Sequence, residues 1–305
     1  MQKCTEPEQP RVDITRRAML VSLTIRSWSG KLTDLGVSRE VATRHNALSK
    51  AGSYKKNLVD PAAVKSIQRS RSLIRQTHYA MTTPWDNNNN RLLSMRLYED
   101  YRNQLDTLIE QHRDEVAQFV DNYAGHVEYA AYMLGDMFDA NEYPSAEEIR
   151  TKFHVEYQFE PVTKSEHLVV ELSNRELDRI RRSIQTVFDD RVSESLRSMY
   201  DKLNKCVTKF NERTGKDGDS ADPKVFRDSL LENLREAVEL IPSMNIYDDE
   251  ILNDMCAKTL AAIDGVTANM LREKHADFDD RKAKKVREHT EALEQGLAGY
   301  FGGEQ

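Results

Sequence analysis

Cations interleaved with aromatic rings are the residues of this chain whose types and spacing could do chemistry. Arg26, Trp28 and Lys31 fall together, and Tyr54 directly precedes Lys55. A single-stranded nucleic acid uses both kinds of group, because its phosphates attract cations while its unpaired bases stack on flat rings. On this pattern the candidate DNA-binding residues are Arg16, Arg17, Arg26, Trp28, Lys31, Tyr54, Lys55, Lys56, Lys65, Arg69, Arg75 and Trp85.

These residues lie in a basic stretch, residues 11–96, of a chain that is acidic overall. The stretch holds sixteen Lys or Arg against five Asp or Glu, a balance of +11. Because the whole chain carries −7 and its first ten residues carry −1, everything from Leu97 onward carries −17. Such a split indicates a polyanion-binding surface on an acidic body, although a run of charge is more often a solvated face.

The aromatic candidates have a competing interpretation. Trp28 at a strand end and Trp85 in a proline-containing loop could equally be core side chains, since large aromatic residues are usually buried. Tyr54, in a loop with glycine, serine and lysine, is the better stacking candidate.

No constellation with a catalytic or metal-binding pattern stands out. Lys216 follows Gly215 but lacks the glycine that a phosphate-binding loop places five positions earlier. The carboxylates at 217–222 lack EF-hand spacing, and those at 248–250 are explained by a helix start. The three cysteines are scattered, with no CxxC pair and no histidine at ligand spacing. We therefore expect no enzyme, no metal site and no cofactor.

Composition favours a helical, intracellular protein. With 305 residues and 39% hydrophobic content the chain can bury a real core, and its 12 Gly and 8 Pro favour long helices over a strand-rich sandwich. Scattered cysteines are typical of a reducing compartment. The N-terminus has no signal-peptide core, and no run approaches the roughly 18 apolar residues of a membrane span. The expected location is the cytoplasm, with no membrane contact.

Local patterns predict the elements that would position the basic residues. Residues 18–25 are rich in β-branched side chains and predict a strand. Ser38 could cap a short helix to about Leu48, followed by a loop over residues 50–54.

The second half of the basic stretch predicts a longer helix. Asp60 and Pro61 form a helix start, and the helix continues to about Met81 with an apolar stripe that would point its cations outward. Residues 82–90, with Pro84 and four consecutive asparagines, predict a loop.

Beyond the basic stretch the apolar period becomes helical. Residues 92–134 predict one long helix with an end or kink near residues 122–125. A capping box at 144–148 starts a short helix. Residues 154–160 and 167–172 alternate in polarity and predict a central β-hairpin.

Residues 173–211 predict a second long helix, which could lie antiparallel to the first as a coiled arm. Asp222-Pro223 predicts a further helix that ends before Pro242, and another covers residues 251–269. The last forty residues are expected to be helical as far as Gly296.

Together these patterns predict a mainly α fold. Long amphipathic helices would form coiled arms, with a small strand element near the N-terminus and the central β-hairpin. The expected segments are a flexible arm (1–12), a basic α/β segment (13–96), a long helical arm with the hairpin at 154–172 (97–213) and a C-terminal helical region (222–300).

Five sequence blocks carry a resemblance to a known family: RRAMLVSLTIRSWSGKLTD, AGSYKKNLVD, THYAMTTPWD, YPSAEEIRTKF and FRDSLLENLREAVELIP. In this order they resemble a domain family of unknown function found in phages and prophages, often encoded beside MoxR-type AAA+ ATPases and proteins with a von Willebrand-type domain. The chain is also similar to non-OB single-stranded DNA-binding proteins of podophages that carry a virion RNA polymerase.

The resemblance covers about residues 14–260, and its motifs are structural, so it transfers no active-site residue. It implies a phage protein of the host cytoplasm that acts on replicating or transcribed DNA, with a phage RNA polymerase or an AAA+ ATPase as partner.

The leading hypothesis is a sequence-tolerant single-stranded DNA-binding protein acting in replication, recombination or transcription. Its long amphipathic helices would serve self-association into a homo-oligomer. The alternative is a helical adaptor or scaffold for an AAA+ ATPase or a phage assembly machine, which leaves the +11 stretch unexplained. The hypothesis predicts that Lys55→Glu with Lys56→Glu weakens binding and leaves the helical circular dichroism intact.

Overall fold

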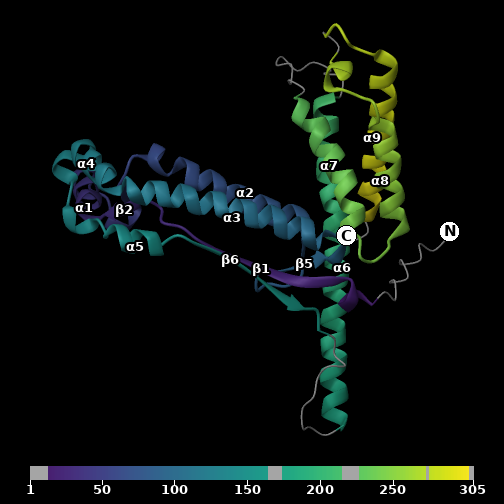
Figure 1. The fold of residues 1–305 in the computed structure, drawn as a ribbon, viewed down its shortest axis with the longest axis horizontal. Coiled ribbons are helices and arrows are strands. Elements are labelled where there is room, and N and C mark those ends of the chain that lie inside the picture. Colours follow the sequence, from purple (N-terminus) through teal and green to yellow (C-terminus); the bar gives the residue numbers. More distant parts are fainter. Residues whose placement is uncertain (1–12, 164–173, 215–226, 273–274, 302–305) are drawn as a thin grey trace. The chain divides into compact units, whose positions relative to one another are not determined.

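The computed structural model describes residues 13–163, 174–214, 227–272 and 275–301. The chain forms two compact units: unit 1 contains residues 1–22, 81–99 and 159–305, and unit 2 contains residues 23–80 and 100–158. The predicted mainly α fold is confirmed, because helices hold most of the described residues and the strands are few and short (Figure 1). Within the described ranges, no helix is both long enough and apolar enough to cross a bilayer.

Unit 2 is built on two helices that lie side by side, α2 (Lys65–Met81) and α3 (Tyr98–Asp121) (Figure 1). Their facing sides belong to one apolar cluster, in which each buried side chain contributes about 1.5–3 kcal/mol. The cluster comprises Val59, Val64, Ile67, Val116, Phe119, Val120, Tyr123 and Ile149.

Two buried polar contacts also join these helices. His78 Nδ1 lies 2.8 Å from the Tyr101 hydroxyl, and His112 Nδ1 lies 2.8 Å from Ser70 Oγ. Since buried polar groups are costly without partners, these contacts fix the register of α2 on α3.

The predicted start of the α2 region is confirmed. The Asp60 side chain accepts a hydrogen bond from the backbone nitrogen of Ala62 at 2.9 Å, and Pro61 opens a short 3-10 turn (Pro61–Val64) that leads into α2. Proline is tolerated in a first turn because its missing N–H would have no helical partner there.

Five further elements belong to unit 2: β2 (Lys31–Asp34), α1 (Leu35–Arg44), β3 (Tyr54–Asn57), α4 (Tyr123–Leu134) and α5 (Ala146–Thr151). Two local predictions are corrected here. Asp34 caps α1 in place of Ser38, by accepting from the Val37 nitrogen at 2.9 Å. Tyr54 lies in strand β3, which pairs antiparallel with β2, and not in a loop.

The region predicted as one helix over residues 92–134 contains a strand, a short 3-10 turn (Met95–Leu97) and two α-helices. Its first residues form strand β5 (Asn90–Ser94), because Leu92 and Leu93 are buried in a strand ladder, and α3 follows from Tyr98. The predicted break near residues 122–125 is confirmed, since Asn122 separates α3 from α4.

One sheet has the strand order β4-β5-β1-β6, in which β1 is Ala18–Arg26, β4 is Thr83–Pro84 and β6 is His154–Pro161. β1 and β5 pair antiparallel, with Ala18 opposite Ser94. Residues 83 and 84 also pair with β5, so the loop predicted at 82–90 is shorter than expected. β6 confirms the first strand of the predicted hairpin, and residues 167–172 lie outside the described residues.

Four helices make the core of unit 1: α6 (Asn174–Thr214), α7 (Asp228–Met244), α8 (Glu250–Ile263) and α9 (Asp280–Phe301) (Figure 1). The predicted second long helix is confirmed as α6. It packs against α7 and α9. The predicted coiled arm pairs α6 with the first long helix, which is α3 of unit 2 and packs on α2 within that unit.

Two predicted helix ends in this region are wrong. α7 continues through Pro242 to Met244, because a proline so close to a helix end removes only one backbone hydrogen bond. α9 continues through Gly296, where glycine costs only about 1 kcal/mol in a helix. The predicted start at Asp222-Pro223 lies outside the described residues.

Candidate nucleic-acid interface

The twelve predicted residues are divided between the two units. Nine of them belong to unit 2, whereas Arg16, Arg17 and Trp85 belong to unit 1. The basic stretch is also not a basic unit, because unit 2 holds fifteen Lys or Arg against sixteen Asp or Glu. The cations of unit 2 can therefore attract a polyanion only where they are separated from those carboxylates.

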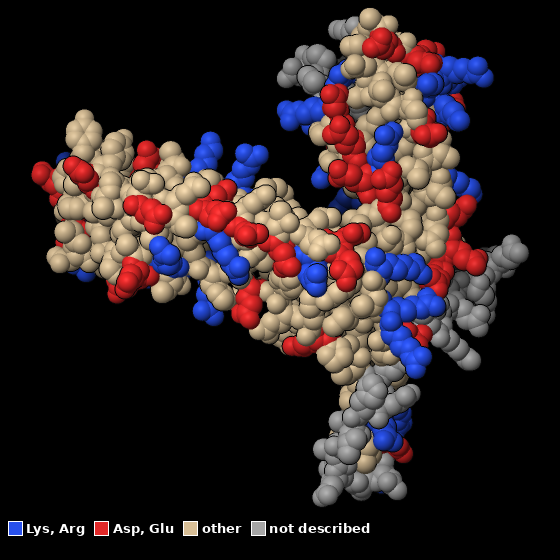
Figure 2. Space-filling view, in the orientation of Figure 1, with Lys and Arg blue, Asp and Glu red and all other residues tan. Residues whose placement is uncertain are grey.

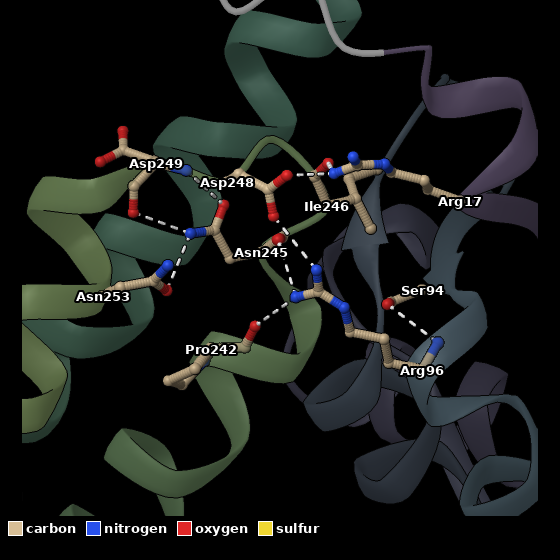
Figure 3. Close-up of polar contacts among 9 residues, drawn as sticks. All are labelled: Arg17, Ser94, Arg96, Pro242, Asn245, Ile246, Asp248, Asp249 and Asn253. Atoms are coloured by element: carbon tan, nitrogen blue, oxygen red, sulfur yellow. Dashed lines mark hydrogen bonds and ion pairs between the residues drawn. The ribbon is translucent and has the colours of Figure 1, made fainter.

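Arg17 is engaged within unit 1. Its guanidinium forms an ion pair with Asp248 and donates to the Ile246 carbonyl at 3.5 Å (Figure 3). Arg96 approaches the other oxygen of Asp248 at 3.1 Å and donates to the Pro242 carbonyl at 3.3 Å. The hydrogen bond from Arg17 holds the pKa of Asp248 below its usual value. Arg17 therefore contacts the turn between α7 and α8, and its DNA-binding role stays a prediction.

Both tryptophans are used for packing, the alternative that the sequence left open. Trp85 is 5% exposed and meets Phe188 edge-on, with ring centroids 5.5 Å apart. Trp28 is half-buried, with ring centroids 6.1 Å from Phe119 and 6.2 Å from Tyr123. The stacking of bases on these indoles stays a prediction, and in this conformation both rings pack against neighbouring aromatic side chains.

Lys56 is not available to a ligand either. Its side chain is 3% exposed, and its Nζ lies 2.7 Å from Glu142, 3.4 Å from Asp34 and 2.8 Å from the Met137 carbonyl. Burial lowers the pKa of Lys56, but the attraction of Glu142 and Asp34 outweighs burial and raises the pKa above its usual value. Lys55 is exposed because successive strand residues point to opposite faces.

Helix α2 carries three of the predicted residues on its exposed surface. Its exposed cations are Lys65, Arg69 and Arg75, and its sequence contains no acidic residue. At 3.6 residues per turn these cations lie within about half of the helical circumference, with Tyr79 among them. Tyr79 is 43% exposed. Among the described residues none of these three cations forms an ion pair.

The neighbouring helix α3 has the opposite character, with seven acidic residues and two arginines. On the face shown in Figure 2, blue side chains project from the edge of unit 2 that α2 forms, and red side chains gather over α3. A polyanion would therefore be attracted to one side of the helix pair and repelled from the other.

A smaller group of predicted residues lies on the β2–β3 pair. Lys31 opposes Asn57 and Lys55 opposes Thr33, so these two lysines share one face of the pair. Tyr54 points to the other face and is 39% exposed. The best stacking candidate of the sequence therefore does not lie beside Lys55 in space. Arg16 and Arg26 are exposed at the two ends of the β1 region.

Sequence reasoning missed Arg71, a half-buried cation on the same side of α2 as Arg75. A signal existed, because Arg71 belongs to the same acid-free run.

In the part of the chain that the structure describes, no group of three or more His, Cys, Asp or Glu could hold a metal ion. Comparison with known proteins found no matching family model, curated protein or solved structure.

Proposed function

We propose that this protein binds single-stranded nucleic acid in a sequence-tolerant way, through the exposed face of α2 in unit 2. The observation that carries the proposal is a helix with exposed cations at Lys65, Arg69 and Arg75, a partly exposed Tyr79 and no acidic side chain. We further propose a setting in phage replication, recombination or transcription, which rests on the resemblance described above.

The spacing of the cations suits an extended strand. Lys65 and Arg75 are ten residues apart, which is about 15 Å along the helix axis and spans a few nucleotides. Cations at such intervals attract successive phosphates, and a ring among them accepts any base, because every base has a stacking face. Neither kind of contact reads sequence.

The experiment is a titration of labelled oligo-dT, and of a duplex of equal length, at several salt concentrations. The test variant carries Lys65→Gln, Arg69→Gln and Arg75→Gln. Three lost phosphate contacts should reduce the slope of log K against log salt by about 2 for a single strand. Fluorescence anisotropy measures the binding, and we expect the wild type to prefer the single strand.

The matched control removes three exposed lysines from unit 1: Lys205→Gln, Lys258→Gln and Lys284→Gln. Each forms an ion pair with a carboxylate four residues away on its own helix. The control changes net charge by the same amount and should leave the salt slope near the wild-type value. Equal slopes for both variants would remove α2 as the interface.

A second candidate function, a helical adaptor for an AAA+ ATPase or an assembly machine, is favoured by one observation. Helix α1 buries none of its residues, and its Leu35 and Val41 are 64% and 49% exposed, with Leu48 nearby at 69%. Large apolar side chains exposed on one short helix favour a docking role. If oligo-dT gives no signal even at low salt, the adaptor becomes the leading function.

A further inference from the structure

Unit 2 contains a groove of about 490 Å³ that the binding face of α2 does not include. It lies between α3, α5 and the start of β6. Its wall combines apolar side chains with titratable ones. Its lining includes His112, Arg113, Val116, Arg150, Phe153 and His154.

The floor of the groove includes His112, which is 2% exposed. The Ser70 hydroxyl donates to Glu115, so we assign the ring proton of His112 to Nδ1, which lies 2.8 Å from Ser70 Oγ. In this tautomer Nε2 carries the lone pair. Burial keeps the pKa of His112 below its usual value, so the ring is neutral at pH 7.

Nε2 of His112 is buried and has no hydrogen-bond partner among the described residues. A buried acceptor without a donor costs about 1–3 kcal/mol, so a ligand that donates a hydrogen bond there would recover that energy. This arrangement is not a nucleophile with its base, because a catalytic triad places histidine between serine and acid. Here Ser70 stands in the middle and is 4% exposed.

The mouth of the groove is cationic. Arg113 and Arg150 are both exposed, and the nearest carboxylate to Arg150 is Asp121 at 3.9 Å. Glu156, the one carboxylate of the lining, accepts hydrogen bonds from Gln158 at 2.9 Å and from His154 at 3.2 Å. Both carboxylate oxygens of Glu156 are thus hydrogen-bonded to these donors, and the two guanidinium groups remain to attract an anion.

Apolar side chains also line the groove. Val116 and Val155 line the groove together with Phe153, a half-buried ring. A slot of this kind accepts a flat, partly apolar group, and its polar ends fix the orientation of that group.

We propose that the groove binds one nucleoside monophosphate unit. The phosphate lies between Arg113 and Arg150, the base lies in the slot against Phe153, and an N–H of the base donates to Nε2 of His112. Guanidinium groups suit phosphate because their paired N–H groups match two of its oxygens. The proposal stands on residues other than those of the α2 face, so either proposal can fail without the other.

The experiment uses the full chain with dAMP as the probe, and with adenosine, ribose 5-phosphate and inorganic phosphate as partial probes. Isothermal titration measures affinity, and the ¹⁵N shift of His112 Nε2 reports hydrogen-bond acceptance. We expect dAMP to bind at least tenfold more tightly than each partial probe and to move the Nε2 signal, because losing one charge-assisted hydrogen bond costs about tenfold.

The test variant carries Arg113→Gln and Arg150→Gln, and Lys152→Gln is the control because Lys152 is exposed beside α5 and does not line the groove. Both side chains of the test variant are exposed, so it should fold. We expect at least tenfold weaker dAMP binding in the test variant and no change in the control.

Three results would overturn the proposal: no heat with millimolar dAMP, equal dAMP affinity in wild type and test variant, or inorganic phosphate binding as tightly as dAMP with an unmoved Nε2 signal. Competition by an oligonucleotide with a 5′-phosphate, but not by the same oligonucleotide with a 5′-hydroxyl, would support the site and assign it to strand ends. Binding of dAMP without such competition would support the site and assign it to free nucleotides.

Discussion

The cations at the edge of unit 1 and those on α2 come from the same basic stretch but have different surroundings. Arg17 and Arg96 both contact Asp248, a residue more than 150 positions away in sequence, and they also donate to backbone carbonyls. Lys65 and Arg69 project from a helix that has no carboxylate of its own. The first pair stabilises a turn, and the second pair is available to an external anion.

This difference shows why local net charge overestimates a binding surface. A surface ion pair contributes only about 0.2–1 kcal/mol, so the pair of Arg17 with Asp248 adds little to stability. The charge of Arg17 is nevertheless partly neutralised by Asp248. Lys56 is the stronger case, because it is buried between two carboxylates in unit 2. What decides availability is the position of the carboxylates after folding.

The largest expected effect separates two adjacent lysines. Lys56→Ala leaves Asp34 and Glu142 without their shared cation and should lower the free energy of unfolding by about 3 kcal/mol, since breaking a buried pair is costly. Lys55→Ala should change it by less than about 0.5 kcal/mol. Urea denaturation measures both. Similar losses in the two variants would contradict the assignment of Lys56 as an internal residue.

The same contrast corrects the charge-reversal experiment suggested by the sequence. Lys56→Glu would add a third carboxylate next to Asp34 and Glu142, so the double variant with Lys55→Glu should lose helical circular dichroism or thermal stability. Lys55→Glu alone is the informative variant.

The second effect concerns Lys202, a half-buried cation of unit 1. Burial, aided by Arg91, lowers its pKa to about 7, whereas the unfolded value is about 10.4. Between these values the unfolded chain binds more protons, so this residue makes stability rise with pH. Lys202→Met should stabilise the protein at pH 7, because it removes an ammonium that is costly to bury. The gain should be only about 1–2 kcal/mol, because the wild-type ammonium keeps some contact with water and a hydrogen bond to Thr82.

Denaturation of wild type and Lys202→Met at pH 7 and pH 9.5 checks this prediction. The advantage of the variant should shrink as the pH rises, because the folded lysine is neutral above its pKa and the cost of removing its proton falls as the pH approaches the unfolded pKa of about 10.4. An advantage that is constant over this range would show that packing, and not ionisation, is responsible.

A smaller effect comes from releasing the engaged arginines. Asp248→Asn should cost less than about 1 kcal/mol, because the pairs are exposed. If the ion pairs with Asp248 keep Arg17 and Arg96 from binding DNA, the variant should bind oligo-dT slightly more tightly at low salt than Asp254→Asn does. Asp254→Asn makes the same change in net charge on α8. Identical affinities would show that Arg17 and Arg96 lie outside any binding surface even when free.

The smallest expected signal is in tryptophan emission. Because both indoles are packed, oligo-dT should leave wild-type emission unchanged even when anisotropy shows binding. Tyr79→Trp places an indole among the α2 cations, and its emission should be quenched by the same oligonucleotide. Quenching in the wild type would instead restore a stacking role for Trp28 or Trp85.

Local rules predicted the parts of the fold that depend on local interactions. The Asp60-Pro61 start and the Ser145–Glu148 capping box are both present, because each is completed within four residues. Leu92 and Leu93 were assigned to a helix because a short apolar run looks the same in a helix and in a buried strand. Pairing with β1 decides between the two, and that information lies more than 70 residues away.

The two candidate sites differ in the same way. The cations of α2 could be found because they lie in one continuous, acid-free run. The groove could not, since His112, Arg150 and His154 come from α3, α5 and β6, and their spacing matches no metal or catalytic motif. Likewise, no sequence pattern connects Arg17 with Asp248.

An acidic protein with one purely cationic helix should behave in two ways during purification. Its pI of about 5.7 predicts retention on an anion exchanger at neutral pH. The edge of α2 should also hold it on heparin or phosphocellulose, where a protein with evenly mixed charges and the same pI would flow through. The same edge would carry host nucleic acid through a first column, so absorbance at 260 nm in early fractions is an expected property of the folded chain.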